Sequence, residues 1–288
     1  MSLLQIGGRE WLDWPFQPEV ILPLLLLEGV YLYAVSELRP RISDAGRVSR
    51  RQLALFSSGM LVLYLATGSI VDHLADNFLL SAHVVELVMI TLVAAPLLIS
   101  GTPGWLVDYA LRSAGVARFA RLVTHPLVGL AAYNGVLLIT HLPFFYDWAL
   151  RNEGPHLLMH AMWFVAGVLM WWSILSPTSQ LPRLSYPLQM GYLFLQSLVP
   201  AVLASFITFA DSVVYPFYEA APRIWGLSPI EDQQIAGGLM KLFGSLILWS
   251  FLVVVFFRWY AQERAQEQGS RRTEVEEERG QVGLTKWG

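Results

Sequence analysis

The sequence predicts an all-α membrane protein with seven transmembrane helices. Hydrophobic residues make up 55% of the 288 residues and charged residues only 14%, and the mean hydropathy is positive. A soluble domain of this size carries more charge. Apolar runs long enough to cross a bilayer recur along the chain, and their length requires helices, because barrel strands are half as long and alternate.

The first three predicted spans lie in the N-terminal third of the chain. The run over 18–37 has Glu28 midway and ends before a loop rich in arginine. The run over 51–70 follows that loop, and the run over 78–99 begins after a short polar stretch. Each has about the 20 residues that a membrane helix needs.

The remaining four spans are predicted over 126–145, 156–175, 187–210 and 235–258. Each is a long apolar run, and the last contains Lys241. The chain thus divides into an outer N-terminal segment (1–17), a transmembrane domain (18–260) and a polar cytoplasmic tail (261–288). The tail is charge-mixed, which is typical of a solvated segment or a helical extension.

The distribution of basic residues predicts the orientation. Fifteen lysines and arginines fall in the loops after the first, third and fifth spans and in the tail, against Arg9, Arg151 and Arg223 on the other side. The positive-inside rule places the N-terminus outside and the C-terminus in the cytoplasm. We therefore expect a multi-pass protein of a bacterial plasma (inner) membrane, surrounded by membrane lipid.

Composition also excludes several classes of function. The chain has no cysteine, which excludes disulfides, thiolate metal sites and cysteine nucleophiles. A net charge of −3 gives no argument for nucleic acid as a partner. No nucleophile–base arrangement and no phosphate-binding glycine loop is present, so we expect a protein that is not an enzyme.

Histidines gather at the outer ends of the predicted spans and form the candidate metal site. His156 and His160 begin the fifth span, His83 lies one turn inside the third, and His141 lies near the outer end of the fourth. A four-residue spacing places two imidazoles on one helix face. Imidazole binds copper and zinc, and the nearby thioether of Met159 would suit reduced copper. The alternative is that each histidine has a structural role only and forms hydrogen bonds at the membrane interface.

Carboxylates accompany these histidines. Asp72, Asp76 and Glu86 are candidate oxygen ligands or second-shell partners. Charged residues in a membrane span normally face the bundle interior and are paired. We therefore predict an ion pair between Glu86 and Lys241, which serves helix packing or, alternatively, proton transfer.

Several short blocks occur in an order that matches a known family. The blocks are 76–83 (DNFLLSAH), 95–98 (APLL), 101–103 (GTP), 141–143 (HLP) with Tyr146 and Asp147, 156–160 (HLLMH), 166–167 (AG), 171–172 (WW), 215–218 (YPFY) and 231–237 (EDQQIAG). Together they resemble the seven-span CtaG-like proteins, over about residues 20–260.

This resemblance implies an assembly factor for caa-type cytochrome c oxidase that is associated with copper supply. The expected partners are cytochrome c oxidase subunits, the expected metal is copper, and Asp232 joins Asp76 as a candidate second-shell or ion-pair residue. In the family the third span usually reads His-x-x-Gln-His, whereas here Glu86 replaces the glutamine and Leu87 the second histidine.

Two other functions remain open from the sequence. The first is a membrane redox protein that holds haem between histidines of different helices, for example His83 or His141 with His156. The second is a transporter of a small solute or metal. The charged residues Glu28, Glu86 and Lys241 within the predicted spans are the only feature of the sequence that favours this function. The chain shows no inverted repeat, which counts against transport.

Overall fold

The chain folds as a bundle of helices in the computed structural model, which describes residues 12, 16–42 and 46–285. Across these ranges all regular structure is helical. Six segments are long and apolar enough to cross a membrane, and a seventh is counted if one bent pair of helices forms a single span. The predicted all-α membrane bundle is confirmed. The predicted outer segment 1–17 lies outside the described residues except for residues 12, 16 and 17.

The elements follow in the order of the predicted spans. They are α1 (Pro18–Tyr33), η2 (Ala34–Leu38), η3 (Arg39–Arg41), α2 (Arg50–Thr67), α3 (Ile70–Asn77), α4 (Leu80–Val88), η4 (Met89–Ala94), α5 (Ala95–Gly101), α6 (Gly104–Ala110), α7 (Ala114–Val123), α8 (Pro126–Thr140), α9 (Pro143–Leu150), α10 (Glu153–Leu175), α11 (Tyr186–Phe209), α12 (Pro216–Ala220) and α13 (Pro229–Thr285).

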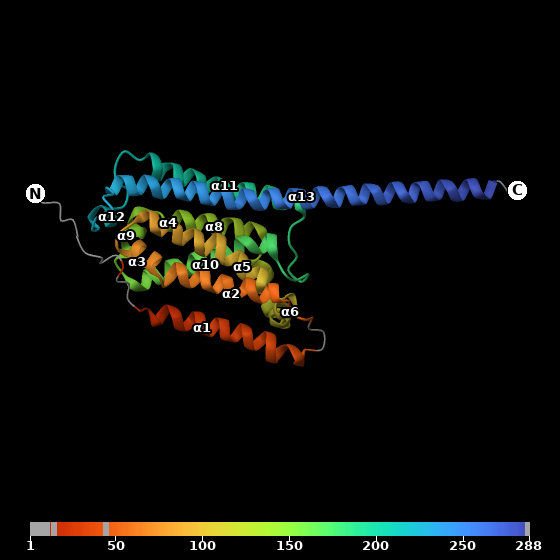
Figure 1. Ribbon diagram of the computed structural model, residues 1–288, viewed down its shortest axis with the longest axis horizontal. Helices are drawn as coiled ribbons and strands as arrows, with labels where there is room; N and C mark the ends of the chain where they lie inside the picture. The colour runs from red at the N-terminus through yellow and green to blue at the C-terminus, as the bar shows by residue number, and fades with distance from the viewer. Residues whose placement is uncertain (1–11, 13–15, 43–45, 286–288) are drawn as a thin grey trace, which may run out of the picture.

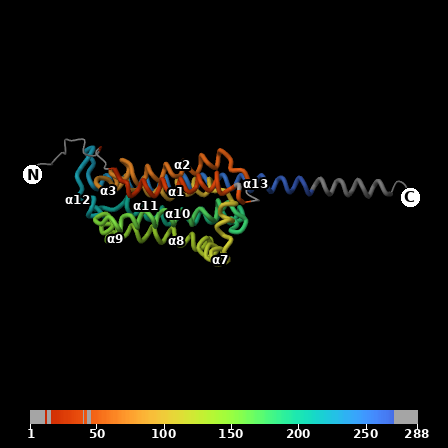
Figure 2. The backbone as a smooth tube through the Cα atoms, turned by 90° about the horizontal axis from the view of Figure 1, so that it is seen from below, coloured from red at the N-terminus to blue at the C-terminus, as the bar shows by residue number. Residues whose placement is uncertain are grey.

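The helices run roughly along one axis. Figure 1 shows α1 at one edge of the bundle and the neighbouring helices α11 and α13 at the opposite edge. The short helices α3, α9 and α12 lie at one end, and α6 and α7 lie at the other (Figures 1 and 2). Most of the predicted cytoplasmic arginines precede or follow helices at the α6–α7 end. Which end faces the cytoplasm stays a prediction.

The fourth span differs from its prediction. The predicted helix over 126–145 ends at Thr140, because Leu142 is held in an extended conformation before Pro143. The chain then turns into α9. At the other end, α7 precedes α8 at a bend of 59°, and this bent pair is the fourth candidate span.

The third span contains a π-helical stretch, η4, just before Pro96. A proline has no backbone N–H and crowds the carbonyl four residues earlier, so the regular ladder cannot continue through it. The carbonyl of Thr91 in this stretch accepts a hydrogen bond from Nε1–H of Trp171 at 2.9 Å. The irregular turn therefore joins this span to α10.

The last helix extends beyond the bundle. Helix α13 runs for 57 residues without a break and continues past the other helices (Figure 2). The predicted polar tail is therefore helical as far as Thr285. Because most residues after Tyr260 are polar or charged, we expect this extension to lie outside the apolar layer.

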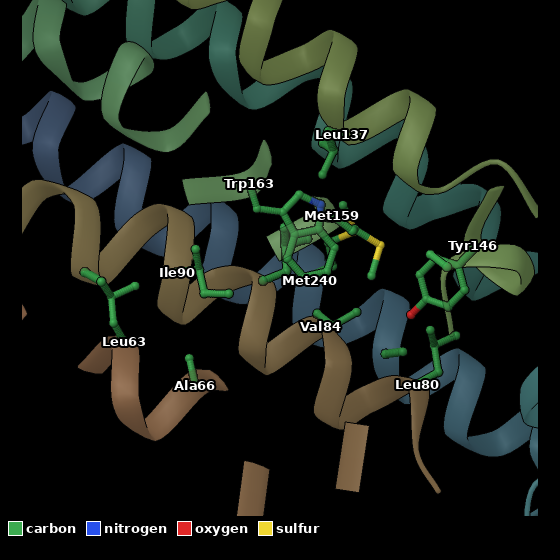
Figure 3. Packing of buried hydrophobic residues seen from close by; sticks show 14 of the residues in the cluster. Leu63, Ala66, Leu80, Val84, Ile90, Leu137, Tyr146, Met159, Trp163 and Met240 are labelled. Carbon is green, nitrogen blue, oxygen red and sulfur yellow. The ribbon is translucent and has the colours of Figure 1, made fainter. Parts of the chain in front are cut away.

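The core at the α3–α9–α12 end is apolar and aromatic. One buried cluster includes Met159, Trp163 and Met240 from α10 and α13, together with Val84 of α4 and Leu137 of α8 (Figure 3). Met159 and Trp163 are almost fully buried. The cluster fixes α4, α8, α10 and α13 against one another directly below the polar residues described next.

Asp232 caps helix α4 from helix α13. Its carboxylate accepts hydrogen bonds from the backbone N–H groups of Leu80 (2.7 Å) and Ser81 (3.2 Å) and from the Ser81 hydroxyl. The first N–H groups of a helix have no partner within the helix and need such an acceptor. The expected second-shell or ion-pair role of Asp232 is thus corrected to helix capping, which sets the position of α4.

Replacement Asp232→Asn should therefore destabilise the bundle. The amide leaves one N–H of α4 facing another donor, which costs about 1 to 3 kcal/mol. We expect a lower melting temperature of the purified protein in detergent, whereas Glu231→Gln, which changes a neighbouring exposed carboxylate, should have less effect. Equal melting temperatures for Asp232→Asn and the wild type would contradict the capping role.

Candidate metal centre

Three helices each bring a pair of polar residues to the same place. Asp72 and Asp76 lie four residues apart on α3, His83 and Glu86 three apart on α4, and His156 and His160 four apart on α10. Residues three or four apart share one face of a helix. The faces of α3, α4 and α10 that carry these pairs turn toward one another.

Glu86 lies at the centre of the cluster. Its Oε1 is 2.9 Å from Nε2 of His160, and its Oε2 is 3.3 Å from Nδ1 of His83. Nε2 of His156 is 3.2 Å from Oδ1 of Asp76. The ring centroids of His156 and His160 are 4.3 Å apart, and each is 6.3 Å from that of His83.

The ligand atoms form two adjacent groups. In each group, one imidazole or carboxylate atom from each residue lies within 4.8 Å of the others. The two groups are Asp76, His83 and His156, and Asp72, Glu86 and His160. A separation of this size lets three donors converge on one small ion with minor adjustments of side-chain rotamers.

These polar atoms are buried, and none has a partner with hydrogen-bond geometry. The set consists of Asp76 Oδ1, both ring nitrogens of His83, both carboxylate oxygens of Glu86, and Nε2 of His156 and of His160. Buried polar groups are nearly always hydrogen-bonded, since leaving them unpaired is costly. The imidazole nitrogens and carboxylate oxygens approach one another to 2.9–3.3 Å without that geometry, so the cluster is a candidate cation site.

Neighbouring residues hold the cluster in place. Gln17, just before α1, donates from Nε2 to Asp72 at 2.8 Å. The rings of Tyr146 and Trp163 each lie 4.9 Å from that of His83, and Nε1–H of Trp163 donates to Thr140 at 3.0 Å. Aromatic rings therefore enclose the imidazoles on the side of the core.

His141 does not join the cluster. Its Nδ1–H donates to the carbonyl of Leu137 at 2.8 Å, and its ring lines a separate cavity of about 810 Å³ between α11 and α13. The prediction that His141 is a fourth ligand is wrong, because the turn after Thr140 directs it to another face of α8.

The predicted ion pair of Glu86 with Lys241 is also wrong. Glu86 contacts His83 and His160, whereas Lys241 is exposed and donates to the Ser205 hydroxyl at 3.3 Å. The two side chains do not meet because α13 presents Lys241 away from α4. Depth in a span can be read from sequence, whereas the facing direction depends on packing.

Met159 and Leu87 also have packing roles. Met159 is fully buried in the apolar cluster beneath the histidines, and Leu87 belongs to the same cluster. The position where the resemblance leads one to expect a histidine is therefore apolar here. Glu86, next to it in the sequence, contacts His83 and His160 at the centre of the cluster.

The comparison with known families identifies the family of the chain. The model of the cytochrome c oxidase caa3 assembly factor family (Caa3_CtaG) matches residues 29–262, which is most of the chain. The chain belongs to the Caa3_CtaG family. The family match includes α4 and α10 with their histidines and carboxylate. Comparisons with curated proteins and with solved structures gave no match.

Membership of the Caa3_CtaG family links the chain to cytochrome c oxidase. It confirms the resemblance found from the sequence blocks and agrees with the helical membrane fold. Gln17 was not found by sequence reasoning. It stands alone before the first span, and only the folded chain brings it to Asp72.

Proposed function

We propose that this Caa3_CtaG protein binds copper as cargo at the α3–α4–α10 cluster and supplies it to a subunit of cytochrome c oxidase. The role is transient binding and transfer, without bond-making chemistry. The cluster lies at the end of the bundle that the arginine distribution assigns to the outer face of a bacterial plasma membrane. Copper delivery at that face would make the protein an assembly factor.

One observation carries the proposal: buried carboxylate and imidazole atoms converge from three helices without hydrogen-bond partners. Three carboxylates, from Asp72, Asp76 and Glu86, place negative charge in a cluster that aromatic rings enclose on the side of the core. A divalent cation at this place would balance the carboxylates and use the lone pairs of the imidazoles.

The donor set fits copper in its oxidised state. Imidazole nitrogen suits copper, and among divalent first-row metals copper generally has the highest affinity for nitrogen and oxygen sites. The sulfur expected to favour reduced copper belongs to Met159, which packs in the apolar core. His83, His156, His160 and Glu86 would hold the ion, while Gln17 would orient Asp72.

A gradient of exposure favours one side for entry and release. The side chains of Asp76 and His156 are 26% and 15% exposed, whereas Glu86 is fully buried. Asp76 and His156 therefore form the outer group, and Glu86 with His160 forms the inner one. We expect copper to be exchanged with a partner through the outer group.

The structure gives less support to the two alternatives. A haem needs a flat gap between its axial histidines, but His83 is enclosed by the rings of Tyr146 and Trp163 and contacted by Glu86. A visible absorption spectrum tests for haem directly. For transport, Glu28 pairs with Ser57 and Lys241 with Ser205, away from Glu86. Ion-gradient-dependent uptake into vesicles would revive that alternative.

Copper binding by the purified protein tests the proposal. Wild-type protein loaded with copper and then desalted should retain the metal, and His156→Ala should bind it at least about tenfold more weakly, because it removes a ligand of the outer group. His125→Asn is the matched control: it removes an imidazole that only caps α8, and asparagine is also a good cap. Metal-free wild-type protein, or equal losses in both variants, would overturn the proposal.

A further inference from the structure

A second polar site lies at the opposite end of the bundle. A cleft of about 440 Å³ opens there between α2, α5, α10 and α13. Three arginines from separate parts of the chain line it: Arg51 at the start of α2, Arg183 before α11 and Arg258 on α13. This is the end of the bundle where α13 emerges (Figure 1).

The three guanidinium groups have no carboxylate partner among the side chains that the structure describes. None of them forms an ion pair with a residue in the described part of the chain, and no acidic side chain of that part lines the cleft. Arginine recognises phosphate through its planar set of donors. Three unpaired arginines around one opening therefore favour an anionic ligand.

The interior of the cleft is apolar. Below the arginines its walls are formed by side chains such as Leu92, Ile174, Phe251 and Val255. Along α13 the lining extends from Arg258 to Ile247, eleven residues or about 16 Å of helix. This length matches half of a hydrocarbon layer of about 30 Å, which is the depth of one leaflet.

Charge and shape together indicate the occupant. We infer that the cleft between α2, α5, α10 and α13 binds an anionic phospholipid, with its phosphate at Arg51, Arg183 and Arg258 and an acyl chain along the apolar walls. A basic opening over an apolar slot between membrane helices matches such a lipid in both head and tail. A soluble anion would use only the arginines, and a zwitterionic lipid would gain less from three positive charges.

Binding of this lipid would have a structural consequence. The cleft joins helices that are distant in sequence, α2 and α13, at the end opposite to the candidate copper site. A lipid held there would link α2 to α13 and neutralise three arginines that otherwise repel one another. We therefore expect the bound lipid to raise the melting temperature of the protein.

Native mass spectrometry of the delipidated full-length protein tests the inference. Dioleoyl phosphatidylglycerol should bind more tightly than dioleoyl phosphatidylcholine. Each of Arg51→Gln, Arg183→Gln and Arg258→Gln should weaken phosphatidylglycerol about fivefold, since each removes one positive charge near the phosphate. Arg118→Gln, which removes an exposed arginine of α7 outside the cleft, should leave the affinity unchanged.

Two further binding measurements use the wild-type protein and therefore do not depend on the folding of a variant. Dihexanoyl phosphatidylglycerol, whose tails are too short for the cleft, should bind more weakly than the dioleoyl lipid. Inorganic phosphate should not displace the bound lipid. Equal binding of the two dioleoyl lipids, equal losses in Arg118→Gln and the cleft variants, or displacement by phosphate would overturn the inference.

Discussion

Glu86→Gln is expected to weaken copper binding at least about 100-fold. Glutamine keeps the size of the side chain but removes the charge, and its amide places a donor where His83 and His160 need an acceptor or a shared cation. Among the residues that the structure describes, Glu86 contacts histidines of both α4 and α10 through its two oxygens, so both groups of ligands should be affected. Copper affinity measured by competition with a chelator of known affinity shows the loss.

Glu28→Gln provides a matched control for this experiment. Glu28 is also a membrane-span glutamate, but it accepts a hydrogen bond from the Ser57 hydroxyl at 2.6 Å, far from the histidines along α1 and α2. It should bind copper like the wild type. If the two variants bind equally, the cluster around Glu86 does not hold the ion.

Deletion of the gene should reduce both the activity of the caa-type oxidase and the copper content of that enzyme. The wild-type gene should restore both, whereas genes carrying Glu86→Gln or His160→Ala should leave them near the level of the deletion strain. These variants change the centre of the cluster, so the cellular defect should follow the loss of binding. Membrane levels of each variant, measured by immunoblotting, separate loss of function from loss of protein.

The addition of copper to the deletion strain provides a further test of copper supply. If the protein supplies copper, added copper should partly restore oxidase activity in the deletion strain. Normal oxidase activity and copper content without the protein would contradict the assembly role. If the deletion strain has defective oxidase and every gene with a cluster variant restores it, the result would instead support an assembly role without copper binding.

Much of the fold follows from the sequence because membrane helices depend on local composition. Long apolar runs located the spans, and lipid leaves no other backbone structure for them. The exception is the fourth span, because the predicted helix continues through Leu142–Pro143. The apolar signal continues across that point, but the backbone preference of the residue before proline ends the helix.

The site was predictable in part for the same reason. The i, i+4 spacing of His156 and His160 and the i, i+3 spacing of His83 and Glu86 fix each pair on one face of its helix. Which faces meet depends on helix rotation and packing, and these are difficult to predict from the sequence. His141, Lys241 and Asp232 lie outside the cluster, where they take part in a hydrogen bond to Leu137, a contact with Ser205 and the cap of α4.

X-ray absorption spectroscopy at the copper edge is the most direct test of the central claim that imidazole and carboxylate groups of α3, α4 and α10 hold copper. The account predicts bound copper with only nitrogen and oxygen neighbours at about 2.0 Å, including the outer-shell scattering of imidazole rings, and fewer imidazoles in His160→Ala. A sulfur neighbour near about 2.3 Å, or imidazole scattering that His160→Ala leaves unchanged, would contradict it.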